Sequence, residues 1–328
     1  MGRQLNRTLV TKVLEYVPNH TNPVQYIMKL LDLSSESVYR RIRGEIAFTL
    51  EEISKLSAEM NFSLDHVLGI GQEDNHLRFG SFANTLEGKP EMFVSTLQMY
   101  IDLAIKWNKA QHIESLLMLN SLPIILITEY DHLFKFFYYK WLHQTSEVSL
   151  TCRFSEVEIP EDIVRLKEIL NEPVHRKGKN AVILDRNIFL DLIGEVQYYH
   201  MRNLITGDDI ALIRDDLTDL ATQLEKWAQI GVLKDDRQSF IYLSSLNVMS
   251  NSAYINVDGE LSSYFSMVSS RPLITTNVEI CERLKRAFMI TKKYSVLITQ
   301  SNELLQSQFF TQQREFIKGM GSKDFIHL

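Results

Sequence analysis

The apolar positions in the first 70 residues recur at intervals of three and four, in short blocks. Such spacing places the apolar side chains on one face of a helix. Pro18, Gly44 and Gly69 follow three of the blocks, and proline and glycine commonly mark helix ends. The pattern predicts five short amphipathic helices around one core, over about residues 10–17, 23–31, 34–43, 50–60 and 63–68.

Residues 33–44 form the block around which the first 70 residues are expected to be organised. Ser34 can cap a helix by accepting a backbone hydrogen bond, and Gly44 can take the left-handed conformation that ends it. Val38 and Ile42 fall on one apolar side. The opposite side carries Glu36, Tyr39, Arg40 and Arg43. Arginine can bind a guanine edge or a phosphate, so this helix is interpreted as a recognition helix rather than a merely solvated basic face.

Beyond residue 90 the pattern changes along the chain. Helical spacing covers 90–107, 133–142, 160–170 and 208–227, strand-like segments cover 240–246, 253–257 and 264–268, and helical spacing returns from 276 and over 302–318. The dipeptide Asp258-Gly259 is typical of a tight turn between two antiparallel strands. The sequence therefore predicts helices beside a small antiparallel sheet near 240–275.

These patterns predict a mainly α protein in two parts. Residues 1–70 are expected to form a five-helix DNA-binding domain, 71–89 a linker rich in glycine and asparagine, and 90–328 an α+β regulatory and dimerisation region. A chain of 328 residues that is 45% hydrophobic is long enough for two or three domains with ordinary cores.

Charge is distributed unevenly between these parts. Residues 1–70 contain eight basic and eight acidic residues, so the remaining 27 basic and 33 acidic residues account for the net charge of −6. A neutral domain is a weaker electrostatic footprint for DNA than a strongly basic one. Because the positive charge of this domain is concentrated in 33–44, we expect modest DNA affinity per copy and a requirement for two copies.

The N-terminal succession resembles the lambda-repressor-like, Cro-type (XRE-like) helix-turn-helix family of transcription regulators. The resemblance is carried by residues 30–33 at the turn, 34–38 opening the recognition helix, 43–44 ending it and 49–69 closing the core, about a fifth of the chain. It implies that the recognition helix enters the DNA major groove and that the preceding helix anchors the phosphate backbone. The DNA-binding residues it implies are Asn22, Ser34, Ser35, Glu36, Tyr39, Arg40 and Arg43.

Two residues depart from the pattern of that family. Glu36 is acidic where many relatives carry a neutral polar residue, and it can either accept a hydrogen bond from a cytosine amino group or pair with Arg40. Arg41 stands where an apolar residue is common. These departures leave the base specificity open.

No pattern for catalysis, a cofactor or a metal was found. Glu129 and His132 have a spacing that suits two metal ligands on one helix face, but a diiron site needs a second such pair, so a helix-surface pair is the preferred interpretation. The sequence has neither a nucleophile elbow nor a glycine-rich phosphate loop. Cys152 and Cys281 lie in no paired motif and are expected to be reduced core residues. We expect a protein that is not an enzyme.

The function predicted from the sequence is a sequence-specific, DNA-binding transcription regulator. It is expected to be a cytoplasmic homodimer on double-stranded DNA, without a signal peptide or membrane span, and with an unknown small-molecule or peptide effector. The aromatic helix near 134–141 and the last two helices are candidate dimer seams. The alternative is a protein-interaction adaptor whose helix-turn-helix does not bind DNA, and an enzyme with an appended DNA-reading domain is the third choice.

Overall fold

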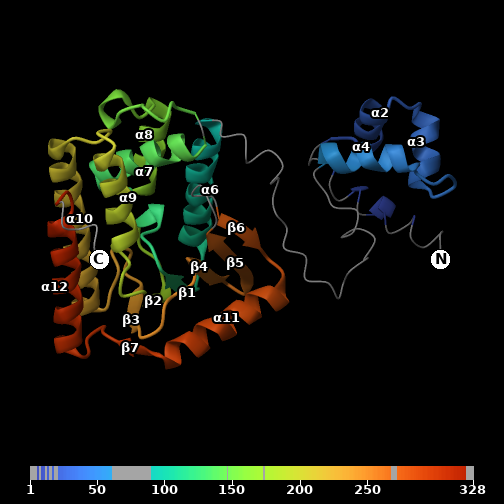
Figure 1. The fold of residues 1–328 in the computed structure, drawn as a ribbon. Coiled ribbons are helices and arrows are strands. Elements are labelled where there is room, and N and C mark those ends of the chain that lie inside the picture. Colours follow the sequence, from blue (N-terminus) through green and yellow to red (C-terminus); the bar gives the residue numbers. More distant parts are fainter. Residues whose placement is uncertain are drawn as a thin grey trace. The chain divides into compact units, whose positions relative to one another are not determined.

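The chain forms two compact units, Met1–His76 and Leu77–Leu328 (Figure 1). The computed structural model describes residues 6, 9–11, 13–14, 17, 21–60, 90–145, 147–172, 174–266 and 272–322. The expected linker, residues 71–89, lies outside the described residues.

The first unit packs short helices around a small apolar core. Its helices include α2 (Pro23–Leu31), α3 (Ser35–Ile42) and α4 (Leu50–Met60). Ile27, Val38 and Leu56 from these helices are fully buried, together with Leu9 and Val13 from the segment before them. The apolar stripes predicted from the sequence thus face one another, and each helix depends on the others because it is too short to be stable alone.

The described part of this unit has fewer helices than the five expected. It contains four helical segments, the first including residues 6, 9–11 and 13–14 and the others being α2, α3 and α4. The fifth predicted helix, which was expected to begin near Ser63, falls outside the described residues.

An ion pair inside the first unit fixes α3 against α4. Arg41 donates hydrogen bonds from Nε to Glu52 Oε2 at 2.8 Å and from Nη2 to Glu52 Oε1 at 2.7 Å, and a third from Nη1 to Ser37 Oγ at 2.7 Å. Glu52 also caps α4 by accepting from the Thr49 amide at 2.9 Å. Arg41, which was a departure from the family pattern, is therefore buried and turned toward the core, and this two-pronged contact sets which side of α3 faces outward.

The second unit is built on a mixed sheet. Its described residues form seven strands in the order β6-β5-β4-β1-β2-β3-β7, with β1, β2 and β3 parallel and the other neighbouring pairs antiparallel. The strands are β1 (Ile113–Leu119), β2 (Gly178–Leu184), β3 (Gln238–Ser244), β4 (Ser252–Val257), β5 (Glu260–Ser266), β6 (Pro272–Thr275) and β7 (Ser295–Leu297).

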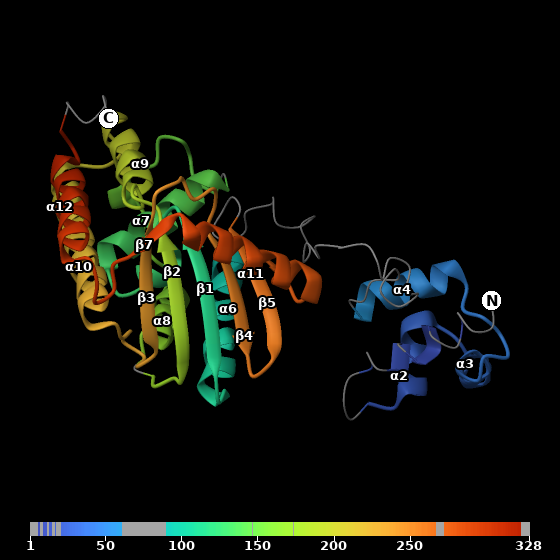
Figure 2. The same ribbon diagram turned by 90° about the horizontal axis from the view of Figure 1, so that it is seen from below.

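Helices cover both faces of this sheet (Figure 2). The long helices are α6 (Pro90–Lys109), α7 (Asp131–Gln144), α8 (Glu161–Leu170), α9 (Leu190–Met201), α10 (Gly207–Ile230), α11 (Val278–Lys293) and α12 (Glu303–Gly319), and η2 (Ile124–Leu126) and η3 (Phe154–Glu156) are short 3₁₀ turns. α11 lies across one face, where Phe288 and Leu284 pack on the sheet, while α6, α7 and α8 lie on the other. Within the described part of the chain, no helix combines the length and apolar character that crossing a membrane requires.

The predicted fold class, with a small antiparallel sheet near 240–275, was therefore wrong. The predicted strands correspond to β3, β4 and β5, and Asp258-Gly259 does form the turn between β4 and β5. β1 and β2, which lie at the centre of the sheet, were not predicted. A central parallel strand is covered on both faces and so lacks the alternation of apolar and polar residues by which a strand is recognised.

The aromatic residues of α7 form the centre of the larger core. Phe134, Phe136, Tyr139 and Trp141 are all 2% exposed or less, and Phe93 of α6 lies against Trp141 with ring centroids 5.4 Å apart. Because these side chains are buried within one copy of the unit, they cannot form a dimer seam, and α7 is therefore not the seam for which it was one of two candidates.

Glycine at one position allows the central strands to pair. Gly178 has a φ of +149°, and a Cβ atom added there would lie 2.0 Å from the carbonyl oxygen of Ile113, its partner on β1. This close approach begins the parallel ladder that brings Ser115 opposite Asn180 two residues later. A side chain at 178 must therefore displace the backbone of β1 or β2.

Gly178→Ala is expected to destabilise the second unit by about 1–3 kcal/mol or more, because both the backbone conformation and the contact with Ile113 become unfavourable. Gly194→Ala is the matched control: Gly194 lies inside α9 with nothing within 4 Å of an added Cβ, so this change should stabilise the unit by about 0.5–1 kcal/mol. Urea denaturation followed by tryptophan fluorescence measures both. Effects of the same sign would contradict the assigned role of Gly178.

Protonation of Glu52 is expected to loosen the first unit at low pH. Burial raises the pKa of this carboxyl, but hydrogen bonds from Arg41 and Thr49 and the charge of Arg41 outweigh it, so the net pKa is lowered. The stabilisation is thus complete above the ordinary carboxyl pKa of about 4.3 and is lost as the pH falls through the lowered value. Hydrogen exchange in α3 and α4 should show this loss of protection.

At pH 7, Glu52→Gln should reduce the opening free energy of α3 and α4 by about 1–3 kcal/mol and remove the dependence on acid pH. Glu51→Gln is the control, because Glu51 is the exposed neighbour in the same helical turn. Equal effects of the two substitutions would show that the Arg41–Glu52 contact does not hold these helices together.

Candidate nucleic-acid interface

A tight turn joins α2 to α3. Asp32 has the left-handed conformation, with φ 54°, and the Leu33 amide donates to the carbonyl of Met28 at 3.3 Å. The chain then enters α3 at Ser35, so residues 32–34 make the whole connection. A connection of three residues between two helices packed on a common core has the length of the turn in a helix-turn-helix.

Side-chain caps define where both helices start. Asn22 Oδ1 accepts from the amides of Val24 and Gln25 at 3.0 and 3.3 Å, and Ser34 Oγ accepts from the Ser37 amide at 3.3 Å. The amides bound by Asn22 are therefore already occupied. If Asn22 contacts a phosphate, its exposed side-chain amide nitrogen is the free donor for that contact.

α3 has two distinct sides. Val38 is fully buried and Arg41 is 9% exposed, so these residues turn inward toward the core. The exposed side brings together the residues predicted from the sequence, Ser35, Glu36, Tyr39, Arg40 and Arg43. The structure thus places the predicted α3 residues on one continuous outer surface, which we call the α3 outer face.

The charges of the α3 outer face are held loosely. Arg40 Nε lies 3.4 Å from Glu45 Oε2, and Arg43 Nη1 lies 3.7 Å from Glu45 Oε1. The arginine side chains are 52% and 66% exposed, so these pairs are screened by water and contribute little to stability. Arg43 also lies 5.7 Å from the centre of the Tyr39 ring. Both guanidinium groups can therefore leave Glu45 and bind a phosphate or a base at a small cost in free energy.

The sequence left two roles open for Glu36, which were pairing with Arg40 and accepting a hydrogen bond from a cytosine. In the described part of the chain, the carboxylate partner of Arg40 is Glu45 and not Glu36. Glu36 is exposed in the first turn of α3, where a negative charge also interacts favourably with the helix dipole. Its carboxylate remains available to accept a hydrogen bond from a ligand.

The acidic partners of Arg40, Arg41 and Arg43 were not predicted from the sequence. Glu45 follows the end of α3 and reaches back to both Arg40 and Arg43. Glu52 caps α4 through the Thr49 amide, and its contact with Arg41 was not predicted. The inward position of Arg41, three residues after Val38, is the signal that could have indicated a buried partner.

The candidate metal pair of the second unit is not assembled. Glu129 lies before α7 rather than on it, and it pairs with Lys234 at 2.6 Å, whereas His132 Nδ1 lies 3.5 Å from Asp216. Among the described residues, no group of three or more histidine, cysteine, aspartate or glutamate side chains is arranged to hold a metal ion. The free thiols of Cys152 and Cys281 have pKa values that burial raises above the ordinary range.

Comparison with known protein families gives a match in the first part of the chain. The BetR domain family matches residues 16–86, which include α2, α3 and α4 and none of the strands of the mixed sheet. No curated protein and no solved structure matches the chain. The chain is thus similar to the BetR domain over the region that carries the α3 outer face.

Proposed function

We propose that this protein is a sequence-specific DNA-binding transcription regulator. The observation that carries the proposal is the α3 outer face, where Arg40, Arg43 and Tyr39 are exposed on a helix whose opposite side is fixed in the core. The three-residue α2–α3 connection supports a helix-turn-helix, a motif in which the second helix enters the major groove. The expected resemblance to lambda-repressor-like regulators is consistent with this arrangement.

The dimensions of α3 support an approach to the major groove. A helix with its side chains is about 10–12 Å across, which fits a major groove about 12 Å wide, and the eight residues of α3 make it roughly 12 Å long. Each arginine can form a two-pronged contact with a guanine or with a phosphate. A helix this short contacts few base pairs, so one copy cannot supply much specificity.

Two copies acting on one site would supply the missing specificity. We propose a homodimer that binds half-sites about 34 Å apart, one turn of the DNA helix. The second unit is proposed to provide the assembly surface and to sense an effector. Met289 and Ile290 of α11 and its C-cap residue Tyr294 are all at least 49% exposed, which favours the dimer seam expected at the last two helices. With DNA as its target, the protein is proposed to act in the cytoplasm.

Selection of bound sequences from a random duplex pool tests this proposal. The full-length protein at near-physiological salt should enrich a motif with two-fold symmetry. Arg40→Ala or Arg43→Ala should weaken binding to that motif by about 1–3 kcal/mol and relax one position of it if the arginine reads a base. An arginine that contacts only phosphate should instead weaken binding to all sequences and reduce the salt dependence.

Lys55→Ala serves as the control substitution, because Lys55 is an exposed cation on α4 outside the α3 outer face. It should leave the enriched motif unchanged. If folded protein enriches no sequence at any salt concentration, the DNA-binding proposal fails. The adaptor becomes the better account if, in addition, Arg40→Ala and Arg43→Ala weaken the binding of a protein partner.

A further inference from the structure

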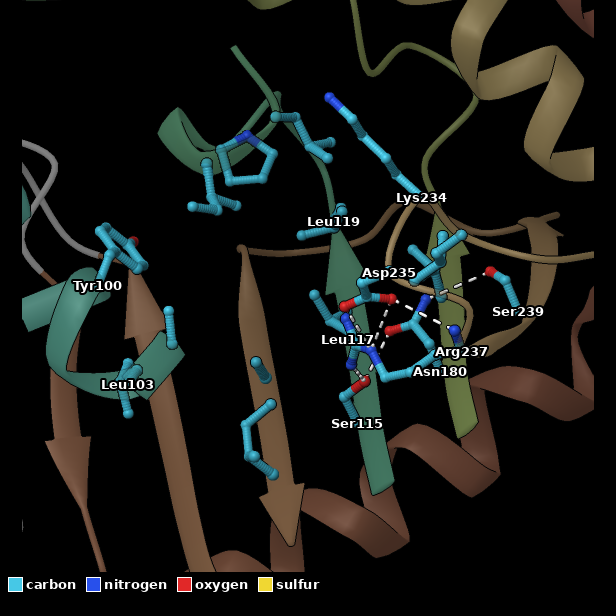
Figure 3. Close-up of a pocket in the computed structure, with 18 of the residues that line it drawn as sticks. Tyr100, Leu103, Ser115, Leu117, Leu119, Asn180, Lys234, Asp235, Arg237 and Ser239 are labelled. Atoms are coloured by element: carbon cyan, nitrogen blue, oxygen red, sulfur yellow. Dashed lines mark hydrogen bonds and ion pairs between the residues drawn. The ribbon is translucent and has the colours of Figure 1, made fainter. Parts of the chain in front are cut away.

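A cavity of about 360 Å³ lies between the mixed sheet and the helices of the second unit (Figure 3). Its floor comes from β1, β2, β3 and β4, and its other walls include α6, η2 and the end of α10. Most of the lining is apolar, with Leu117, Leu119, Val182 and Ile241 on the sheet and Leu103 on α6. Apolar cavities of 300–1,000 Å³ with a few polar groups are typical of small-molecule sites.

A row of polar residues crosses the floor where apolar residues would be expected. Ser115, Asn180 and Ser239 are register partners on β1, β2 and β3, and each is at most 4% exposed. Ser115 Oγ donates to Asn180 Oδ1 at 2.7 Å, and Asn180 Nδ2 donates to Ser239 Oγ at 3.4 Å. The next inward row, at Leu117, is apolar, so the polar row is confined to one end of the cavity.

This polar row holds one of the guanidinium groups of the cavity. Arg237 Nη1 donates to Ser115 Oγ at 3.0 Å, and Arg237 Nε lies 2.9 Å from Asp235 Oδ2. Arg176 Nη1 donates to the same Asp235 oxygen at 3.0 Å. Figure 3 shows the side chains of Ser115, Asn180, Asp235 and Arg237 grouped beside β1 and β2. Within the described residues, the Nη2 groups of both arginines lack a hydrogen bond.

The charges of this cluster do not cancel. Arg176 and Arg237 share the single carboxylate of Asp235, which leaves one net positive charge, and Arg237 and Asp235 are 7% and 8% exposed. Burial lowers the pKa of Arg237 from its usual value, and Arg176 adds to this effect while Asp235 opposes it. At the rim, Glu129 and Lys234 pair with each other, and the lining residue Glu172 is exposed. A buried charge without a full counter-charge is costly, and a bound anion would remove that cost.

An unpaired donor in the same wall also calls for a ligand with an acceptor. Trp107 of α6 lines the cavity, and its Nε1 is buried with no hydrogen-bond partner in the described part of the chain. Arg176 and Arg237 lie 5.6 and 5.3 Å from the centre of its ring. Buried polar groups are nearly always paired in native proteins, so the unpaired indole nitrogen is a second observation that indicates a bound acceptor.

The size and opening of the cavity limit the apolar part of the ligand and its route of entry. A cavity of about 150 Å³ holds benzene in another protein, so the larger volume here suits a body of about two rings or a medium-length acyl chain. The lining residues Ile125, Glu129 and Lys234 are more than 40% exposed, which places an opening to solvent beside them. A ligand can therefore enter past Lys234 and reach Arg237 at the polar end.

We propose that this cavity binds a small organic acid, with its apolar body against Leu117 and Leu103 and its carboxylate at Arg237, Arg176 and Trp107. The proposal concerns the second unit alone and stands whether or not the first unit binds DNA. If the proposed regulator function is correct, this acid is its effector, and that last step rests on the proposed function.

Calorimetric titration of the full-length protein with matched acids and amides tests the proposal. The probes are octanoate, octanamide, 2-naphthoate and 2-naphthamide at neutral pH. At least one acid should bind at least tenfold more tightly than its amide. The neutral amide cannot balance the net positive charge of Arg237, Arg176 and Asp235. The proposal would be overturned if neither acid binds folded protein, or if no acid that binds does so more tightly than its amide.

Substitutions locate the bound acid. Arg237→Gln should weaken binding of the acid at least tenfold, whereas Arg283→Gln, which alters an exposed arginine of α11, should not change it. If Arg237→Gln does not fold, Ala104→Phe answers the same question, because a phenyl group from α6 would fill part of the cavity while leaving the polar cluster intact. Folded Ala104→Phe protein that binds the acid as tightly as the wild type would contradict the assignment.

Discussion

Both units of this protein depend on one physical constraint, which is that a buried guanidinium group must be held by a carboxylate. In the first unit Glu52 holds Arg41 with a pair of hydrogen bonds and thereby fixes the orientation of α3. In the second unit Asp235 holds both Arg237 and Arg176. Removing either carboxylate would leave positive charge in a poorly solvated place, so these contacts are expected to determine local structure even where they add little net stability.

The two sites differ in how completely that constraint is met. Arg41 is matched by one carboxylate and further bonded to Ser37, so its role is to support the α3 outer face. Arg40 and Arg43 remain exposed in their long contacts with Glu45. In the cavity, a single carboxylate serves two arginines and the Trp107 donor is unpaired. Complete pairing favours a structural role, and incomplete pairing in a roomy cavity favours a binding role.

The sequence was informative where one side of an element faces water. The inward position of Val38, the cap at Ser34 and the turn at Asp258 followed from spacing and residue type. The central strands β1 and β2 could not be predicted in this way, because both of their faces are covered and their parallel pairing joins residues 65 positions apart. The polar row through Asn180 could not be predicted either, because its residues become neighbours only through the register of three strands.

The central claim is that the α3 outer face contacts DNA, and site-specific photocrosslinking tests it most directly. A photoreactive benzoylphenylalanine in place of Tyr39, which is 44% exposed, should crosslink the protein to a random-sequence duplex at low salt. The same group in place of Tyr198 of α9, which is 54% exposed, is the comparison and should give little crosslinked DNA. Crosslinking that is no greater at position 39 than at position 198, in folded protein, would contradict the account.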